Sequence, residues 1–195
     1  MTTIAIALFP TVEELDWAGP WDVLASWAEH FPDDGVTVFT VADTPDVIEC
    51  AKGMRVLAHH TWDDVPPFDV LVYPGGQGTR PQLGDERIRE RIRRIAAGDT
   101  LMTSVCTGSL VYGDAGLLDG RPATTHWAAM DELRAVGNGI DVREGVRWID
   151  DGDVITAAGV SAGIDMALHL ICRLHSEERA RHVKLAIQYD PQPPV

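Results

Sequence analysis

Residues 100–115, TLMTSVCTGSLVYGDA, decide the fold that we expect for this chain. Thr100–Val105 carries no charge and has the length of a strand that is buried on both faces of a parallel sheet. Cys106–Ser109 follows as a short turn, and the largely apolar Leu110–Ala115 predicts a helix. A strand that turns directly into a helix is the repeating unit of an α/β fold.

The same alternation of strands and helices runs along the rest of the chain. Its 195 residues suffice for one α/β domain, which we place over residues 1–195. We expect a doubly wound, mostly parallel sheet with helices on both faces, and Pro20 in the first turn of the first helix. The pattern predicts strands at residues 4–9, 36–41, 70–73, 100–105, 142–148 and 154–156, a hairpin within 47–58, helices at 20–27, 88–95, 110–115, 127–136, 160–174 and 177–187, and an extended tail at 190–194.

The composition is that of a globular protein with a strong excess of acidic residues. Apolar residues make up 45% of the chain, and 30 acidic residues against 16 lysines and arginines give a formal net charge of −14. Such a field repels phosphate backbones and anionic membranes, so we expect no nucleic-acid and no membrane partner. The apolar run at residues 4–9 is too short for a membrane span or a signal peptide. We therefore expect a cytoplasmic protein with reduced cysteines.

Three junctions between a strand and the loop after it carry chemically useful residues. Asp16 follows the first strand, Gly75 and Gly76 follow the strand at 70–73, and Cys106 follows the strand at 100–105. In open α/β sheets, sites form beyond the carboxyl ends of the strands. If the three strands are neighbours, a carboxyl group, a glycine backbone and a thiol meet on one rim.

Cys106 is the most informative of the three cysteines. The helix that begins just after it points backbone N–H groups at the sulfur, which favours the thiolate and lowers the thiol pKa. The alternative is that Cys106 is a small buried hydrophobe, as free cysteines often are. Cys50 in the hairpin and Cys172 in an apolar helix fit that alternative better.

The other residues of the rim also allow two interpretations. Gly75 and Gly76 form either an ordinary turn or a pair of backbone donors for a developing negative charge. Asp16 either caps the helix that follows it or moves protons for the thiol.

Ser161 and His126 belong to two motifs that we interpret as less significant. Gly159–Gly163 matches the G-x-S-x-G nucleophile elbow, but only helices and a tail follow Ser161, with no later strand to carry an acid and a histidine. Among the histidines, only His126 falls in a loop near the rim, so we expect no metal site.

The segments that carry these residues resemble the ThiJ/PfpI superfamily, whose domains are similar to class I glutamine amidotransferases. The resemblance lies in TSVCTGSL at 103–110, in DVLVYPGGQG at 69–78 and in the opening residues 8–16. Within the superfamily, LDWAGPWDVL at 15–24, ATTHW at 123–127 and residues 159–167 resemble the bacterial isocyanide hydratases. The similarity covers nearly the whole chain.

The resemblance implies a flavodoxin-like fold and a homodimer that acts on a small molecule without a metal or organic cofactor. Cys106 matches the catalytic cysteine, Asp16 matches its acidic hydrogen-bonding partner, and Thr107 matches the residue that shapes the site after the nucleophile. Gly76, with Gly75 beside it, matches the backbone donor of the oxyanion hole. The residues that we expect to line the pocket are His126, Val160 and Ser161.

The activity implied by the resemblance is the hydration of an isocyanide to an N-substituted formamide. Superfamily peptidases and many glyoxalases have a histidine after the nucleophile or a glutamate at the acidic position. Thr107 and Asp16 depart from both patterns. The alternatives are a glyoxalase or deglycase acting on 2-oxoaldehydes, and a non-enzymatic ligand- or redox-sensing domain, because related domains are fused to DNA-binding modules and exposed thiols oxidise.

Overall fold

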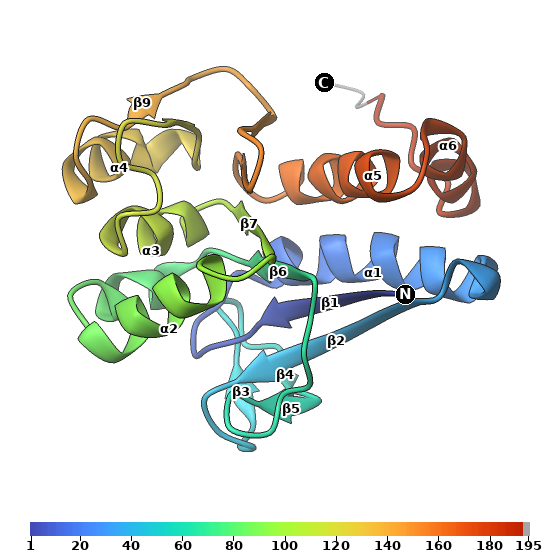
Figure 1. The fold of residues 1–195 in the computed structure, drawn as a ribbon, viewed down its shortest axis with the longest axis horizontal. Coiled ribbons are helices and arrows are strands. Elements are labelled where there is room, and N and C mark those ends of the chain that lie inside the picture. The colour runs from blue at the N-terminus through green and yellow to red at the C-terminus, as the bar shows by residue number, and fades with distance from the viewer. Residues whose placement is uncertain (193–195) are drawn as a thin grey trace.

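A seven-stranded sheet with helices on both faces forms the centre of the computed structural model, which describes residues 1–192 (Figure 1). The strand order is β10-β11-β7-β6-β1-β2-β5, and every pair is parallel except β10 with β11. The predicted doubly wound, mostly parallel sheet is confirmed. Its strands are β1 (Thr2–Ala7), β2 (Val36–Ala42), β5 (His60–Thr61), β6 (Val70–Tyr73), β7 (Leu101–Val105), β10 (Trp148–Asp150) and β11 (Val154–Ala157).

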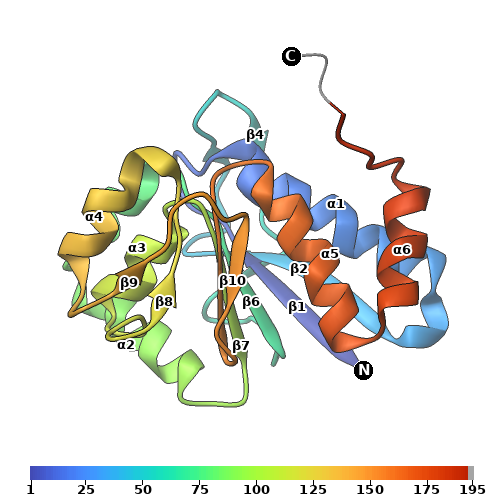
Figure 2. The same ribbon diagram turned by 90° about the horizontal axis from the view of Figure 1, so that it is seen from above.

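The helices form two layers, one on each side of the sheet, as Figure 2 shows from above. One layer contains α1, α5 and α6, and the other contains α2, α3 and α4. Along β1, Ile4 and Ile6 belong to the core under the first layer, and Ala5 and Ala7 belong to the core under the second. Because both faces of β1 are covered, its run of apolar residues is unbroken. The helices are α1 (Glu14–His30), α2 (Glu86–Ala96), α3 (Gly108–Asp114), α4 (Met130–Val136), α5 (Ala162–Leu174) and α6 (Glu177–Ala186).

Two small strand pairs lie outside the main sheet. The predicted hairpin is present as the antiparallel strands β3 (Ile48–Glu49) and β4 (Arg55–Val56), while β8 (Pro122–Ala123) pairs in parallel with β9 (Asp141–Val142). The predicted continuous strand at 142–148 is wrong. Residues 143–147 form a loop instead, in which Gly145 has a φ of 74° that no regular strand accommodates.

The boundaries of two helices differ from the prediction in ways that affect the site. Helix α1 begins at Glu14, so Pro20 lies in its interior and not in its first turn. Asp16 therefore falls in the first turn, where the helix dipole favours a negative charge. Helix α5 begins at Ala162 and not at Val160, because the φ of 51° at Val160 is incompatible with a right-handed helix.

The remaining predictions agree with the structure where it can be compared. The expected helix at 127–136 consists of a 3₁₀ turn, Trp127–Ala129, followed by α4. The expected extended tail at 190–194 lies partly outside the described residues. Within residues 1–192, the helices lack the combination of length and apolar composition that crossing a membrane requires.

Candidate active site

The ends of β1, β6 and β7 bring the three junctions of interest together. Strand β6 lies between β1 and β7 in the sheet, and the three strands run parallel. Asp16 enters from the first turn of α1, Gly75 and Gly76 enter from the loop after β6, and Cys106 enters from the turn after β7. A carboxyl group, a glycine backbone and a thiol therefore share one rim of the sheet.

Cys106 occupies a strained turn between β7 and α3. Its φ of 57° lies in the left-handed region, which costs about 1–3 kcal/mol for a residue with a side chain. The N–H of Cys106 donates to the carbonyls of Ala157 and Ala158, both at 3.1 Å. Its carbonyl accepts the hydroxyl of Thr125 at 2.8 Å. These contacts hold the backbone of the turn in its strained conformation.

Asp16 is fully buried next to that thiol. The N–H of Gly75 donates to Oδ2 at 3.0 Å, and the N–H of Val160 donates to Oδ1 at 3.1 Å. Cys106 lies close to this carboxyl group, because the Cβ position of Gly75 is only 2.8 Å from Cβ of Cys106. The carboxyl group makes no capping bond to α1, so the interpretation of Asp16 as a helix cap is wrong.

Burial changes the protonation of both groups. It raises the pKa of Asp16 to about 7, against the opposing effect of the Gly75 N–H. Burial, and then the charge of Asp16, raises the pKa of Cys106 to about 12, although the N–H and hydroxyl of Thr107 favour the thiolate. The predicted lowering of the thiol pKa is therefore wrong, because loss of water outweighs the dipole of the short helix α3. Between these two values Asp16 is a carboxylate and Cys106 is a thiol, so the pair carries one negative charge.

Gly75, Gly76 and Thr107 form the wall beside the thiol. A Cβ on Gly75 would lie 2.5 Å from the nitrogen of Thr107 and 2.8 Å from Cβ of Cys106, so no larger residue fits. The N–H of Gly75 is occupied by Asp16, and the N–H of Gly76 donates to Oγ1 of Thr107 at 3.0 Å. Of the two glycines, only Gly76 borders the adjoining cavity. Gly76 is thus the glycine that can reach a bound molecule.

A cavity of about 230 Å³ adjoins Cys106 and Thr107. Two of the predicted pocket residues, His126 and Val160, line it. The placement of Ser161 in the pocket is wrong, because its exposed hydroxyl accepts two bonds from the guanidinium of Arg147 at 3.2 Å. The other lining residues are Glu13, Ala51, Gly76, Gln77, Arg80, Ala128 and Ala129.

The sequence did not reveal the charged side chains that line this cavity. Glu13 forms an ion pair with Lys52 of the hairpin. Arg80 pairs with Glu132 at 2.8 Å and also donates to the carbonyl of Gly76 at 3.1 Å. Because both partners lie dozens of residues away along the chain, no local spacing signals these pairs.

The remaining histidines and cysteines add no further chemistry at the rim. The Nδ1 atom of His126 accepts the N–H of Ala128 at 3.2 Å. Within residues 1–192, no group of three His, Cys, Asp or Glu side chains is placed to hold a metal ion. Cys50 is buried as expected, but Cys172 is exposed, because α5 buries Leu170 and Ile171 and turns the next position outward.

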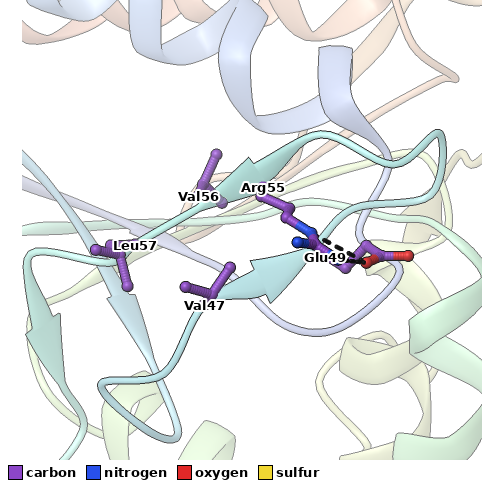
Figure 3. A pocket seen from close by; sticks show the side chains of 5 residues that line it. All are labelled: Val47, Glu49, Arg55, Val56 and Leu57. Carbon is purple, nitrogen blue, oxygen red and sulfur yellow. Dashed lines mark hydrogen bonds and ion pairs between the residues drawn. The ribbon is translucent and has the colours of Figure 1, made fainter.

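A larger hollow of about 510 Å³ lies at the hairpin and shares no residue with the cavity at Cys106 (Figure 3). Glu49 and Arg55 form an ion pair across its floor at 3.2 Å. Its other lining residues, Val47, Val56 and Leu57, are apolar. Its lining contains no cysteine, so it lacks the thiol of the cavity beside Cys106.

Comparison with known proteins shows the family of this chain. Residues 2–173 match the model of the DJ-1/PfpI family. The chain belongs to the DJ-1/PfpI family. A family protein of known structure, a ThiJ/PfpI family protein from Pseudomonas syringae, superposes with a TM-score of 0.89 at 32% identity, over 100% of this chain and 77% of that one. The flavodoxin-like fold implied by the resemblance is confirmed.

Two curated relatives indicate how widely this DJ-1/PfpI domain is used. The isonitrile hydratase of Pseudomonas putida is 43% identical over 191 residues, which cover 98% of this chain and 80% of the relative. The HTH-type transcriptional regulator CdhR of Pseudomonas aeruginosa is 38% identical over 92 residues, which cover 47% of this chain and 27% of the regulator. The first similarity spans the whole site from Asp16 to Val160, whereas the second covers about half of the chain.

Proposed function

We propose that the chain catalyses the hydration of an isocyanide to an N-substituted formamide, with Cys106 as nucleophile and Asp16 as proton carrier. One observation carries the proposal: Gly75, whose N–H donates to the buried carboxyl group of Asp16, lies directly against Cys106, so the carboxyl group and the thiol lie close together beside a cavity that admits a small molecule. The 43% identity to an isonitrile hydratase over 98% of the chain supports the choice of reaction.

The first half of the reaction attaches the substrate to sulfur. The carboxylate of Asp16 takes the proton of the Cys106 thiol as the sulfur adds to the electrophilic terminal carbon of the isocyanide. The proton held by Asp16 then moves to that carbon. The product is a thioimidate in which the former isocyanide carbon carries one hydrogen, a bond to sulfur and a double bond to nitrogen.

The second half uses one water molecule and regenerates the enzyme. Asp16, again a carboxylate, removes a proton from the water as its oxygen adds to the thioimidate carbon, and passes that proton to the nitrogen. The carbon–sulfur bond breaks as the hydroxyl gives its proton to Asp16 and the carbonyl forms, and the thiolate recovers that proton from Asp16. The sum is one isocyanide plus one water giving one formamide, so a nucleophile, a proton carrier and water suffice without a cofactor.

The surrounding residues support these steps by holding the two groups in place. The N–H groups of Gly75 and Val160 hold both oxygens of Asp16 and keep its carboxyl group in place beside the thiol. The N–H of Thr107 and its hydroxyl favour negative charge on Cys106. In our proposal the N–H of Gly76 exchanges its bond to Oγ1 of Thr107 for one to the substrate when charge develops.

We further propose that the protein is a cytoplasmic homodimer. All three cysteines are free thiols, which agrees with a reducing compartment. Leu15, Met54 and Leu57 expose 39%, 50% and 62% of their surface, and such apolar side chains suit a contact between copies. Sedimentation of the purified protein should give about twice the chain mass of 21.3 kDa, and a monomer at micromolar concentration contradicts the dimer.

A direct comparison of two substrates tests the proposed reaction. Purified protein is assayed with a simple aryl isocyanide, following formamide, and with methylglyoxal, following its consumption. We expect turnover of the isocyanide and little reaction with methylglyoxal, because Thr107 and Asp16 depart from the histidine or glutamate that many glyoxalases of the superfamily have at these positions. Faster reaction with methylglyoxal favours the glyoxalase or deglycase alternative, and inactivity with both favours a sensing domain.

A further inference from the structure

The turn before α5 is the second strained turn at the site. Val160 has a φ of 51°, a conformation that a β-branched residue rarely adopts. In this conformation its N–H donates to Oδ1 of Asp16 at 3.1 Å. A strained backbone persists only where its surroundings determine it, so the contacts around Val160 must supply the constraint.

Arg147, which precedes β10, supplies that constraint from the outer side. Its Nε donates to Oδ2 of Asp165 at 2.6 Å, one turn into α5, and two of its other nitrogens donate to Oγ of Ser161 at 3.2 Å. Its backbone carbonyl accepts the N–H of Ala158 at 2.9 Å. Arg147 thus contacts both sides of Val160 along the chain and the first turn of the helix.

The opposite side of the turn is closed by an aromatic ring. A Cβ on Gly159 would lie 2.1 Å from Cδ2 of His126, so the imidazole packs directly on the backbone of Gly159. His126 also lines the cavity at Cys106. The turn is therefore held between His126 on the cavity side and Arg147 on the solvent side.

We propose that Arg147 is a positioning residue for the proton carrier: its guanidinium, bound to Ser161 and Asp165, holds the strained turn so that the N–H of Val160 reaches Asp16. The inference rests on the proposed roles of Asp16 and Cys106. The contacts of Arg147 are half exposed, and exposed ion pairs contribute little to folding. Removing them should therefore disturb the turn and leave the fold intact.

Losing the hydrogen bond from the N–H of Val160 should shift the pKa of Asp16 in a defined direction. A hydrogen bond from Val160 favours the charged carboxylate, so its removal raises the pKa of Asp16. The other charged or titratable groups that act on Asp16 are Cys106 from the β7 turn, Glu13 next to α1 and Lys52 from the hairpin. His126 stands on the remaining side, against the turn itself. None of these groups is altered when Arg147 is replaced.

The first experiment measures the rate at which iodoacetamide modifies Cys106 as a function of pH, read by mass spectrometry of the Cys106 peptide. The wild-type rate should rise in a first step near pH 7, where the Asp16 carboxylate forms and can take the thiol proton, and again only toward the thiol pKa of about 12. In Arg147→Met the step should move up by about half a pH unit or more. Arg143→Met is the matched control, because Arg143 lies in the same loop and its side chain bonds Asp141. In Arg143→Met the step in the modification rate should stay at the wild-type pH.

Asp165→Ala separates positioning from simple charge. Removing a negative charge lowers the pKa of a nearby carboxyl group, whereas releasing Arg147 from its anchor raises that of Asp16. We expect the pH of the step to rise in Asp165→Ala. The rise should be smaller than in Arg147→Met, because Arg147 keeps its hydrogen bonds to Ser161. Tyr189→Phe controls for the bond that Asp165 accepts from Tyr189 at 2.9 Å, and should not move the step.

Two outcomes overturn the inference: an unmoved step in both variants, or a downward shift in Asp165→Ala. A uniform loss of reactivity at every pH also contradicts it, since that indicates general damage and not positioning. If Arg147→Met does not fold, as judged by its melting curve, Asp165→Ala decides alone. The readout is the thiol itself, so failure of the proposed isocyanide activity does not change the result.

Discussion

The N–H of Gly75 donates to Oδ2 of Asp16 at 3.0 Å, although the two residues are 59 positions apart in the chain. The same glycine lies against Cys106, the other half of the proposed catalytic pair, because a Cβ on Gly75 would lie 2.8 Å from Cβ of Cys106. A single residue after β6 thus orients the carboxyl group and makes room for the thiol. The pair depends on this position having no side chain.

Replacing Gly75 with alanine should disable the site without unfolding the protein. The new methyl group would lie 2.5 Å from the nitrogen of Thr107, so the loop must shift and the N–H must leave Asp16. We expect kcat/KM to fall by about a hundredfold or more, as a displacement of about 1 Å does in oriented sites. Gly98→Ala is the control, since its Cβ would meet only the carbonyl of Ile95 at 3.4 Å. Equal activity of the two variants contradicts the role of Gly75.

Replacing Asp16 with asparagine removes the proton carrier. The amide can neither take the thiol proton nor return it to carbon, so turnover of an isocyanide should fall by about a hundredfold or more. One amide oxygen also cannot serve both N–H groups that the carboxylate accepts, from Gly75 and Val160. The measurement is kcat at saturating isocyanide. A variant that keeps more than about a tenth of the wild-type value shows that another group moves the proton.

The activity should depend on pH through the raised pKa of Asp16. Below about pH 7 the carboxyl group of Asp16 is protonated and cannot accept the thiol proton. The value of kcat/KM should therefore fall roughly tenfold for each unit by which the pH is lowered. As pH rises through that value, the carboxylate forms and activity reaches a plateau. A profile of kcat/KM between about pH 5 and 9 checks that activity rises with pH. In Asp16→Asn this rise near pH 7 should be absent. A wild-type limb near pH 4, the range of an ordinary aspartate, contradicts the effect of burial.

The turn at Cys106 was predictable from the sequence because its signal is local. A strand, a cysteine and a helix follow one another within residues 100–115, and the neighbouring junctions repeat the pattern at Asp16 and Gly75. Residue order places each of the three groups just after a predicted strand, and the strand order β7-β6-β1 of the structure shows that these strands are neighbours.

The parts that sequence reasoning missed depend on contacts between distant residues. The thiol pKa was predicted to fall, because the dipole of the next helix is visible in the sequence and the burial beside Asp16 is not. The left-handed conformation of Val160 has no sequence signal either, since valine disfavours it. The G-x-S-x-G pattern around Ser161 does mark a real strand-to-helix turn. Its strained residue is Val160, and its serine faces Arg147.

The most direct test of the central claim compares Cys106→Ser and Ser161→Ala with the wild type on one aryl isocyanide, following formamide at steady state. The hydroxyl of a serine at 106 is too weak an acid to replace the thiol, so kcat/KM should fall by at least about a thousandfold. Ser161→Ala should retain at least about a tenth of the activity, because Ser161 Oγ contacts Arg147 outside the cavity. Turnover that persists in Cys106→Ser and disappears in Ser161→Ala would contradict the assignment of Cys106 as the nucleophile.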